Sequence, residues 1–558
     1  MDMSLSRPWL CHYGDIPKSL SYPGCSMYEL VRLAAEKYPD TRAWEFEGNH
    51  TTYRRFLSRI DAAARALYAL GLRSGDRVML ALPNCPQVAE LFYAADRIGA
   101  VANMVHPLSS AGEFRRYAEL SGSRFAVTLD SFAPLLCVAC PDITVVTTRI
   151  SDALPLLLRP LYRMTREAKY RRRAKKLSPI RWKQFLQGGN GIVLPPLRER
   201  GDAPAVILYS GGTTGITKAI RHSADAFNAA GLQTMAANHF SHPDGHRMIA
   251  VLPNFHGFGL GIGFHAAFIH GCTVMLLPRF SASALMRLLR RRPSYITGVP
   301  TMFEALLRAP APRRLDLSSL RGVYSGGDSL PPDLKARFDA FLAAHGATVL
   351  LREGYGATEC VAACCLSPDT DSRPSSIGIP FPDMRIRVCA PETETPLPPG
   401  EDGELCIAGP TVMLGYLNDP EETALTLHRD TDGTLWLHTG DIGRMDTDGY
   451  FYFRGRLKRM IVTSGYNVYP RELEHILAAH PKIAAVCTVG VPDPYRIQRI
   501  RACIVPIDGI IPGAELEAEI AAYAADNIAR YALPREYVFL KELPKTKLGK
   551  VDFRKLEA

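Results

Sequence analysis

A glycine- and threonine-rich stretch that ends in a lysine is the part of this sequence best suited to chemistry. Residues 210–218 read SGGTTGITK and follow the apolar run AVILY at 205–209. Small residues let main-chain N–H groups approach an anion closely, and the hydroxyl and ammonium groups add further donors. We therefore expect a strand that leads into a polyphosphate loop. A Walker-type NTPase is disfavoured, because no Gly-Lys pair followed by Ser or Thr occurs in the chain.

Further motifs follow this loop in a fixed order. They are YGATE at 355–359, TGD at 439–441, GRLK at 455–458, SGYNVYPRELE at 464–474 and PKTKLGK at 544–550. In this order they resemble the motifs of the adenylate-forming superfamily of acyl-CoA synthetases, luciferases and peptide-synthetase adenylation domains. The N-terminal sequence and a basic insert look most like medium- and long-chain fatty acyl-CoA synthetases. The resemblance covers nearly the whole chain.

The chemistry of that superfamily explains why such residues are needed. An anionic carboxylate must attack the anionic α-phosphorus of ATP, so the site has to neutralise both partners and hold them in line. The resemblance implies ATP and Mg²⁺, an acyl-adenylate with release of pyrophosphate, and transfer of the acyl group to CoA. Failure of free CoA to accept the acyl group would point to a ligase that loads a carrier protein, and an aryl acid remains open as the substrate.

The resemblance assigns most motif residues to ATP. The glycine-rich loop would hold the β- and γ-phosphates through Ser210, Gly211, Gly212, Thr213, Thr214, Gly215 and Lys218. Glu359 would hold Mg²⁺, because a hard cation prefers carboxylate oxygen, and Thr358 would contact the α-phosphate. Tyr355 would stack on adenine beside Gly356.

Other motif residues would serve the ribose and the acyl group. The ribose of ATP is a diol, and a carboxylate can accept hydrogen bonds from both of its hydroxyls. The resemblance implies this role for Asp441, with Arg456 assisting. Lys550 would bridge the acyl carboxylate and the α-phosphate as charge develops. His256 would lie near the reacting carboxylate. After adenylate formation the C-terminal domain would rotate about Lys458, withdraw Lys550 and bring Gly465 to a tunnel for CoA.

The string GGDSL at 326–330 suggests two other activities, and its context disfavours both. A phosphopantetheine carrier is a separate small domain, yet this string lies between two nucleotide motifs. A GDSL hydrolase needs a downstream Asp-x-x-His, and none occurs in the chain. In the superfamily this turn is a wall of the adenine and acyl pocket, which assigns Gly326, Gly327 and Asp328 there.

The loop departs from the common family pattern T-S-G-T-T-G-x-P-K-G at three positions. Gly211 replaces serine, Thr217 replaces proline and Ala219 replaces glycine. Loss of the hydroxyl and of the fixed proline φ leaves open a catalytically inactive, nucleotide-binding relative. The intact Glu359, Asp441 and Lys550 argue against that alternative.

Alternation of short β-branched runs with helical patterns predicts an α/β protein. The expected organisation is an N-terminal adenylation domain at 1–454, a hinge at 455–458 and a mobile α+β domain at 459–558. By resemblance the first region would contain two α/β lobes and a small β-barrel. With 558 residues and 47% apolar content, the chain can bury several cores.

Thirteen irregularly spaced cysteines and the absence of an apolar signal segment predict reduced thiols and a cytoplasmic protein. Residues 257–277 lack charged side chains but contain five glycines, so a buried helix and strand are expected rather than a membrane span.

The net charge of +10 comes from one segment, because residues 159–183 hold eleven Lys or Arg and one acidic residue, a local excess of ten. Together with the leucines before it, the stretch 155–183 predicts peripheral contact with an anionic membrane, with a solvated basic face as the equal alternative. No nucleic-acid motif accompanies it.

Overall fold

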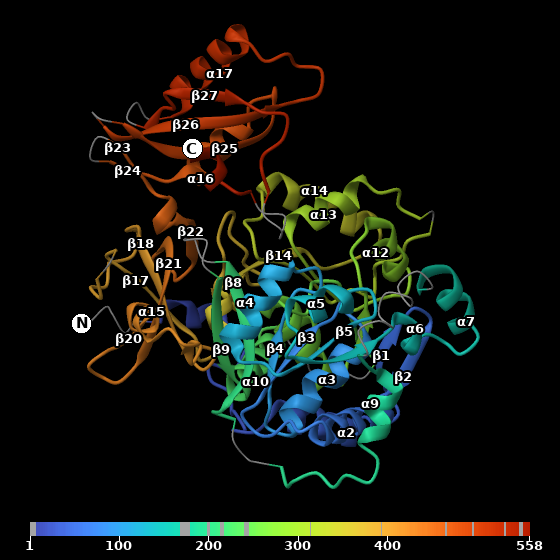
Figure 1. Ribbon diagram of the computed structural model, residues 1–558. Helices are drawn as coiled ribbons and strands as arrows, with labels where there is room; N and C mark the ends of the chain where they lie inside the picture. Colours follow the sequence, from blue (N-terminus) through green and yellow to red (C-terminus); the bar gives the residue numbers. More distant parts are fainter. Residues whose placement is uncertain are drawn as a thin grey trace.

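The computed structural model describes residues 7–167, 179–197, 201–211, 217–238, 245–312, 314–391, 393–463, 466–493, 496–528, 532–545 and 551–557. Four sheets organise these residues, and Figure 1 shows the C-terminal part as a separate body next to the larger N-terminal region. The predicted α/β class is confirmed.

The first lobe is an eight-stranded sheet with the order β19-β9-β8-β4-β3-β5-β6-β7. Its strands are β3 (Arg77–Ala81), β4 (Val101–Met104), β5 (Phe125–Leu129), β6 (Thr144–Thr148), β7 (Ile180–Arg181), β8 (Pro204–Gly211), β9 (Thr217–Ser223) and β19 (Gly415–Tyr416). Strands β3 to β8 run parallel, whereas β9 and β19 are antiparallel additions at one edge. The central strands are buried along almost their whole length, which is why they read as continuous apolar runs.

The second lobe is a nine-stranded sheet with the order β16-β15-β14-β13-β12-β10-β11-β1-β2. Its strands are β1 (Arg42–Phe46), β2 (Asn49–Thr52), β10 (Arg247–Ala250), β11 (Thr273–Leu276), β12 (Tyr295–Gly298), β13 (Gly322–Ser325), β14 (Leu351–Gly356), β15 (Ala363–Leu366) and β16 (Ile379–Pro380). The strands from β1 through β11, β10, β12 and β13 to β14 are parallel.

Helices cover both sheets. They are α1 (Met27–Lys37), α2 (Tyr53–Ala69), α3 (Pro86–Arg97), α4 (Ala111–Ser121), α5 (Ala133–Ala139), α9 (Trp182–Gly188), α10 (Ala224–Ala236), the π-helix η5 (Phe258–Ala266), α11 (Ala267–Ile269), α12 (Ala282–Leu289), α13 (Pro300–Arg308) and α14 (Pro332–Ala344). Side chains from α2, α3, α10 and α11 meet in one buried aromatic cluster, formed by Phe56, Phe92, Tyr93, Phe227 and Phe268. The largest core therefore lies in the helical layer that the two lobes share.

The third part of the N-terminal region is an antiparallel sheet with the order β17-β18-β21-β20, and β22 also pairs with β21. Its elements are β17 (Arg385–Cys389), β18 (Gly403–Ala408), α15 (Pro420–Thr426), β20 (Leu427–Arg429), β21 (Leu435–Met445) and β22 (Phe451–Arg456). The resemblance predicts a small β-barrel here. Within the described ranges no strand pairing closes the sheet, because β20 is only three residues long and pairs with β21 alone.

The C-terminal body contains η7 (Leu457–Arg459), β23 (Ile461–Thr463), β24 (Tyr466–Val468), α16 (Pro470–Ala478), β25 (Ile483–Asp493), β26 (Ile497–Pro506), α17 (Ala514–Asn527), β27 (Glu536–Phe539) and α18 (Arg554–Glu557). Its sheet has the order β24-β23-β26-β25, with β27 on β26. The chain leaves the five-stranded sheet at Arg456 and enters the C-terminal sheet at Ile461, with η7 between them.

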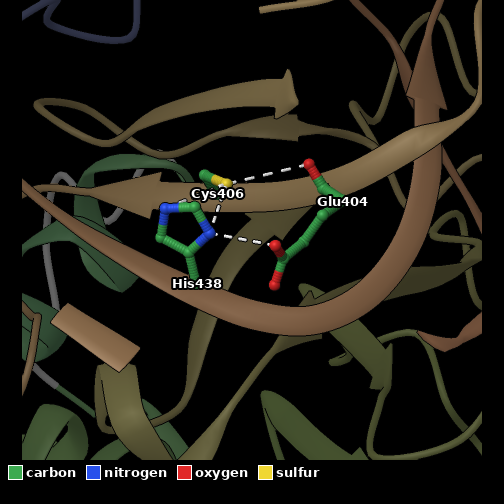
Figure 2. Close-up of side chains that lie close together, drawn as sticks. All are labelled: Glu404, Cys406 and His438. Carbon is green, nitrogen blue, oxygen red and sulfur yellow. Dashed lines mark hydrogen bonds and ion pairs between the residues drawn. The ribbon is translucent and has the colours of Figure 1, made fainter. Parts of the chain in front are cut away.

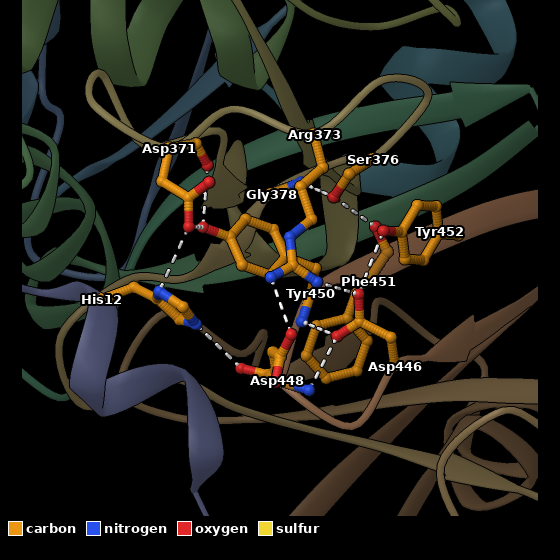
Figure 3. A network of polar contacts seen from close by, with 10 residues as sticks. All are labelled: His12, Asp371, Arg373, Ser376, Gly378, Asp446, Asp448, Tyr450, Phe451 and Tyr452. Atoms are coloured by element: carbon orange, nitrogen blue, oxygen red, sulfur yellow. Dashed lines mark hydrogen bonds and ion pairs between the residues drawn. The ribbon is translucent and has the colours of Figure 1, made fainter.

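Polar contacts connect the N-terminal segment, through the loop at 371–378, to the turn between β21 and β22, the strand that leads into the C-terminal body. Figure 3 shows the network between η2 (Pro8–His12), the loop at 371–378 and the β21–β22 turn. His12 lies 3.5 Å from Asp371 and contacts the main-chain oxygen of Asp448, while Arg373 forms ion pairs of 2.7 Å with Asp446 and Asp448. These contacts fix the turn from which β22 leads to Arg456.

Candidate active site

Three of the four sheets bring their motif residues to one place. The hairpin β8–β9 carries the glycine-rich loop and pairs Ser210 with Lys218 across the ladder. Strand β14 ends at Gly356 and is followed by the turn η6 (Thr358–Cys360), which carries Glu359. Strand β21 carries Asp441, directly opposite Arg456 on β22.

Glu359 is the residue at which the first two of these elements meet. Its Oε1 accepts a hydrogen bond from Tyr416 Oη at 3.2 Å and lies 3.5 Å from Ser210 Oγ. Tyr416 reaches this position because β19 pairs with β9 at the sheet edge. Burial, and then the Glu359 carboxylate, raise the pKa of Tyr416, so this phenol stays a neutral donor. The Glu359 carboxylate is thus held beside the strand that enters the glycine-rich loop.

Lys218 is held by an acidic partner. Its ammonium forms an ion pair with Glu422, which lies in the first turn of α15, and it lies 4.8 Å from the centroid of the Tyr416 ring. Both ends of the pair are half-buried, so solvent screens it only in part. In this structure the predicted phosphate-binding cation is therefore neutralised by Glu422.

Asp441 receives two side-chain contacts from two sheets. Tyr355 Oη donates to its Oδ2 at 2.7 Å, and Arg456 Nε lies 2.8 Å from its Oδ1. Asp441 is 2% exposed and Tyr355 9%. Burial, and then the Asp441 carboxylate, hold the pKa of Tyr355 well above its usual range, and Asp441 raises the pKa of Arg456. The arrangement holds the buried Asp441 carboxyl group between a phenol and a guanidinium group that is always charged.

Asp441 lies in a bulge of β21. Glu404 pairs with Ile442, and Cys406 pairs with His438. The chain therefore advances by two residues on β18 and by four residues on β21 between these two pairs. The extra residues are accommodated by Gly440, whose φ of +67° favours glycine. The bulge turns Asp441 out of the regular ladder and toward Tyr355.

Glu404 stabilises this bulge from the opposite strand. Its Oε1 accepts from the Gly440 N–H at 2.7 Å, and its Oε2 lies 2.9 Å from His438 Nδ1 (Figure 2). The pair raises the pKa of His438. The ligand-type atoms of Glu404, Cys406 and His438 lie within 4.8 Å of one another. Glu404 and His438 already satisfy each other, so the cluster needs no metal ion to explain it.

The predicted adenine and acyl wall lies on the adjoining strand end. Strand β13 pairs with β14 through Ser325 and Glu353, and Gly326 follows it, with its N–H donating to Gly298 O at 3.1 Å. Gly327 and Asp328 are exposed at this edge. Asp328 Oδ1 accepts from the Ser329 N–H, which is a local turn contact.

His256 is half-buried in the turn before η5, with its ring 4.9 Å from that of Phe255. The neighbouring Gly257 is required, because an added Cβ would lie 1.5 Å from Val361 O. Val361 itself has a φ of +66°, which is strained for a β-branched residue. This contact ties η5 to the turn that carries Thr358 and Glu359.

The structure also contains open space beside the same helix. Gly263 is buried in η5, yet an ideal Cβ added to it would meet no heavy atom within 4 Å. Gly259, four residues earlier, would instead place a Cβ 2.1 Å from Pro253 O. The apolar run at 257–277 is thus a buried helix followed by β11, as predicted. No helix in the described ranges has the length and apolar character needed to cross a bilayer.

Several predicted site residues lie outside the described residues. They are Gly212, Thr213, Thr214, Gly215, Gly465 and Lys550. Gly211 ends β8, Thr358 begins η6, and Lys458 lies in η7 between the two bodies.

Four residues of this site were missed by the sequence analysis: Tyr416, Glu422, Glu404 and His438. All four have a partner at least 34 positions away in the chain. Glu422 contacts Lys218, Tyr416 contacts Glu359, and Glu404 and His438 contact each other. No local pattern distinguishes such residues from ordinary surface or strand positions.

The cysteines carry no disulfide. All thirteen are free, as predicted. Cys360 ends η6, Cys364 lies in β15, and both are fully buried. The hydrogen bond with Cys364, and then burial, hold the pKa of the Cys360 thiol well above its usual range. For Cys364 the hydrogen bond with Cys360 lowers the pKa, but a hydrogen bond with Cys365 and burial outweigh it and hold the pKa well above its usual range. Inert buried thiols are therefore the correct description.

Comparison with known proteins identifies the chain. The AMP-binding enzyme family matches residues 31–417, and the AMP-binding enzyme C-terminal domain matches residues 472–550. The long-chain-fatty-acid–CoA ligase of Bacillus subtilis (strain 168) is 32% identical over 99% of this chain and 98% of its own length. The 4-coumarate–CoA ligase 2 of Oryza sativa subsp. japonica is 31% identical over 98% of this chain and 93% of its own length.

A solved structure agrees with these sequence matches. The ATP-bound MatB from Rhodopseudomonas palustris is similar with a TM-score of 0.80 and 25% identity, over 95% of this chain and 98% of that one. The family match covers most of the chain, and the described residues of three motifs (Ser210 and Lys218, Tyr355 and Glu359, and Asp441) are linked by the contacts above. The chain therefore belongs to the AMP-binding enzyme family, that is, to the adenylate-forming superfamily.

Proposed function

We propose that this protein is an AMP-forming acid–CoA ligase that activates a fatty acid as acyl-adenylate, releases pyrophosphate and transfers the acyl group to CoA. The observation that carries the proposal is the convergence of Lys218, Glu359 and the Tyr355–Asp441–Arg456 group from three sheets. The full-length similarity to a long-chain-fatty-acid–CoA ligase supports a fatty acid as the substrate.

The residues present fit ATP and Mg²⁺. Asp441 is a buried carboxylate whose Oδ1 and Oδ2 are both fixed by donors, which suits recognition of a ribose diol. Glu359 offers hard oxygen next to the glycine-rich strand, where Mg²⁺ bound to the phosphates would offset negative charge. Lys218 supplies the cation for phosphate once Glu422 releases it. Tyr355 supplies an aromatic face for adenine.

The same residues account for the first half-reaction. A carboxylate approaches the α-phosphorus only if both anions are neutralised and aligned, which we assign to Thr358 and to Lys550. His256 would line the entry of the acyl carboxylate. For the second half-reaction, a rotation of residues 459–558 about Lys458 would withdraw Lys550 and bring Gly465 to the CoA tunnel. We retain 1–454 and 455–458 as the proposed adenylation domain and hinge.

The test is pyrophosphate release with ATP and Mg²⁺ across acetate, aryl acids and fatty acids of increasing chain length, each with and without CoA. We expect release to be greatest with fatty acids and multiple turnovers only when CoA is present. Greatest release on aryl acids would favour the aryl alternative, which the similarity to 4-coumarate–CoA ligase 2 keeps in view. Adenylation without transfer to CoA would indicate a carrier-protein acceptor, and ATP binding without pyrophosphate release would indicate an inactive relative.

We also propose that the segment 155–183 contacts an anionic membrane. In the short helix α7 (Arg159–Tyr162), the π-turn η3 (Arg163–Glu167) and the residues before them, the apolar side chains point to solvent. The most exposed are Leu156 at 75%, Leu157 at 92%, Leu158 at 48%, Leu161 at 61% and Met164 at 76%.

Polar side chains of this segment instead face the protein. Arg159 Nε donates to Leu154 O at 2.9 Å, Arg163 lies 3.1 Å from Asp152, and Glu167 accepts from Ser151 Oγ at 2.7 Å. This is the reverse of an ordinary surface helix, in which the apolar face is buried. In the sequence, the segment 159–183 carries a charge excess of ten, and its residues 168–178 lie outside the described residues. Exposed leucines and a basic sequence together suit a bilayer that offers both hydrocarbon and anionic headgroups.

Vesicle sedimentation tests this contact. We expect the protein to bind vesicles that contain phosphatidylglycerol, and salt to weaken the binding. Replacing Leu156, Leu157 and Leu161 together by serine should abolish it, because each buried leucine contributes about 1.5–3 kcal/mol. Ile511→Ser, at an 87% exposed side chain elsewhere, is the matched control. Equal binding by the triple variant and the control would show that these leucines do not contact the bilayer. Absence of binding by the wild-type protein would show that the basic face is solvated.

A further inference from the structure

The bulge that carries Asp441 depends on a carboxylate from another strand. A regular antiparallel ladder would satisfy the Gly440 N–H with a main-chain carbonyl of β18. The extra residues of β21 prevent this, and the Glu404 carboxylate accepts that hydrogen bond instead, at 2.7 Å. A side chain thus replaces a main-chain acceptor next to the residue assigned to ribose.

Thr439 completes the support of the bulge. Its hydroxyl donates to Leu405 O at 2.7 Å and accepts from the Asp441 N–H at 3.0 Å. The N–H groups of Gly440 and Asp441 therefore both have a side-chain acceptor, Glu404 on β18 and Thr439 in the bulge itself. This leaves the Asp441 side chain free to meet Tyr355 and Arg456 without strain on the main chain.

His438 fixes the direction of the Glu404 carboxylate. His438 Nδ1 lies 2.9 Å from Oε2 (Figure 2). The other oxygen, Oε1, accepts the hydrogen bond from the Gly440 N–H. Glu404 is 5% exposed, and no solvent competes effectively for its lone pairs. The His438–Glu404–Gly440 chain is therefore rigid and ends one residue before Asp441.

We infer that Glu404 is a positioning residue for nucleotide binding, and that it acts by holding the Asp441 bulge in the shape that presents both carboxylate oxygens to the ribose. The inference rests on the proposed function, because it takes Asp441 as the ribose ligand. It assigns Glu404 no contact with ATP. Its effect must appear in recognition of the ribose hydroxyls and not only in the stability of the protein.

The experiment measures binding of ATP and of 2′,3′-dideoxy-ATP to the full chain by calorimetry, for wild type and variants. In Glu404→Ala the Gly440 N–H loses its buried acceptor, and we expect ATP affinity to fall about tenfold while affinity for the dideoxy analogue changes little. Glu404→Gln can still accept from Gly440 through its amide oxygen. It should fold like wild type and retain most of the preference for ATP.

Glu45→Ala is the matched control for loss of a buried carboxylate. Glu45 is 3% exposed, is held by Arg247 and Arg291, and lies on β1, near the opposite end of the nine-stranded sheet from β14. We expect Glu45→Ala to lower the melting temperature and to leave the ratio of the two affinities unchanged. If Glu404→Ala gives the same unchanged ratio, the positioning role is wrong and Glu404 is only structural.

Asp441→Asn separates failure of this inference from failure of the proposed site. Loss of the preference for ATP in Asp441→Asn but not in Glu404→Ala would overturn the inference alone. An unchanged preference in Asp441→Asn would overturn the ribose assignment, and with it the inference. Loss in both variants, with Glu404→Gln close to wild type, is the expected result.

Discussion

The phenol of Tyr355 and the carboxylate of Asp441 form a 2.7 Å hydrogen bond between the nine-stranded sheet and the five-stranded sheet. The two residues are 86 positions apart in the chain. Because both side chains are buried, a variant that lacks one of them leaves the polar group of the other without water as a substitute partner. The bond therefore couples the shape of the predicted adenine site to that of the predicted ribose site.

Tyr355→Phe should weaken ATP binding. The change removes the hydrogen bond from Tyr355 Oη to Asp441, and loss of a hydrogen bond to a charged group costs about 1.5–3 kcal/mol. We expect KM for ATP to rise roughly tenfold or more. Tyr13→Phe removes the hydroxyl of another buried tyrosine, which donates to Pro380 O, and should leave this KM unchanged. Equal KM values in the two variants would contradict a role for the bond in nucleotide binding.

Glu422→Gln should strengthen ATP binding by the free enzyme. Lys218 must leave Glu422 before it can contact phosphate, so removing the charge of Glu422 removes a competitor. Half-exposed ion pairs contribute up to about 1 kcal/mol, which corresponds to an affinity gain of about twofold to fivefold at low salt. Glu421→Gln, an exposed change on the same helix, is the control. Weaker binding in Glu422→Gln would mean that Glu422 assists the nucleotide instead of competing with it.

Gly263→Leu should shift substrate preference toward shorter acids. An added side chain at Gly263 enters buried open space beside η5, which begins two residues after His256, the residue assigned to the acyl carboxylate. We expect kcat/KM to fall most for the longest fatty acids, while ATP binding and melting temperature stay near wild type. Gly259→Ala should destabilise the protein instead, because its Cβ would meet Pro253 O at 2.1 Å. Unchanged chain-length preference in a folded Gly263→Leu variant would place the acyl chain elsewhere.

Lys550→Ala should separate the two half-reactions. If Lys550 bridges the acyl carboxylate and the α-phosphate, its loss should slow adenylation by roughly 10²–10³. Thioester formation from supplied acyl-adenylate and CoA should be spared. The measurements are pyrophosphate release for the first half and thioester yield for the second, with Lys545→Ala as the control. Equal loss of both halves would refute the assignment.

Glu353→Gln should change how stability depends on pH. Burial raises the pKa of Glu353 to about 7 from 4.5, so the folded state keeps a proton that the unfolded state releases between these values. The contribution of Glu353 to the free energy of unfolding is therefore fully present below pH 4.5. It decreases by about 3 kcal/mol as the pH rises to 7. The glutamine cannot ionise and can still accept from the Leu330 N–H.

The expected result is a variant that melts at a higher temperature than wild type at pH 8 and at the same temperature at pH 4.5. Glu304→Gln is the comparison, because arginine contacts lower the pKa of Glu304, and this variant should lose stability at pH 8. A pH-independent difference between Glu353→Gln and wild type would show that the pKa of Glu353 is the same in the folded and unfolded states.

The sequence by itself determined the residue types of the nucleotide site and the order in which they occur. Lys218, Glu359, Tyr355, Asp441 and Arg456 are all motif residues, and the structure brings them together from three sheets. Their identity could be predicted because each motif is short and its function needs particular atoms close to a turn. The buried helix and strand at 257–277 followed from composition for a similar reason.

Only the tertiary structure decided which partners these residues have. The pairing of β19 with β9 brings Tyr416 to Glu359, and α15 brings Glu422 to Lys218. The bulge at Gly440 and its support by Glu404 depend on the register of two strands more than 30 residues apart. The exposure of Leu156, Leu157 and Leu161 to solvent depends on how this segment packs against the rest of the protein. Such contacts arise from long-range packing, and local sequence patterns carry no information about them.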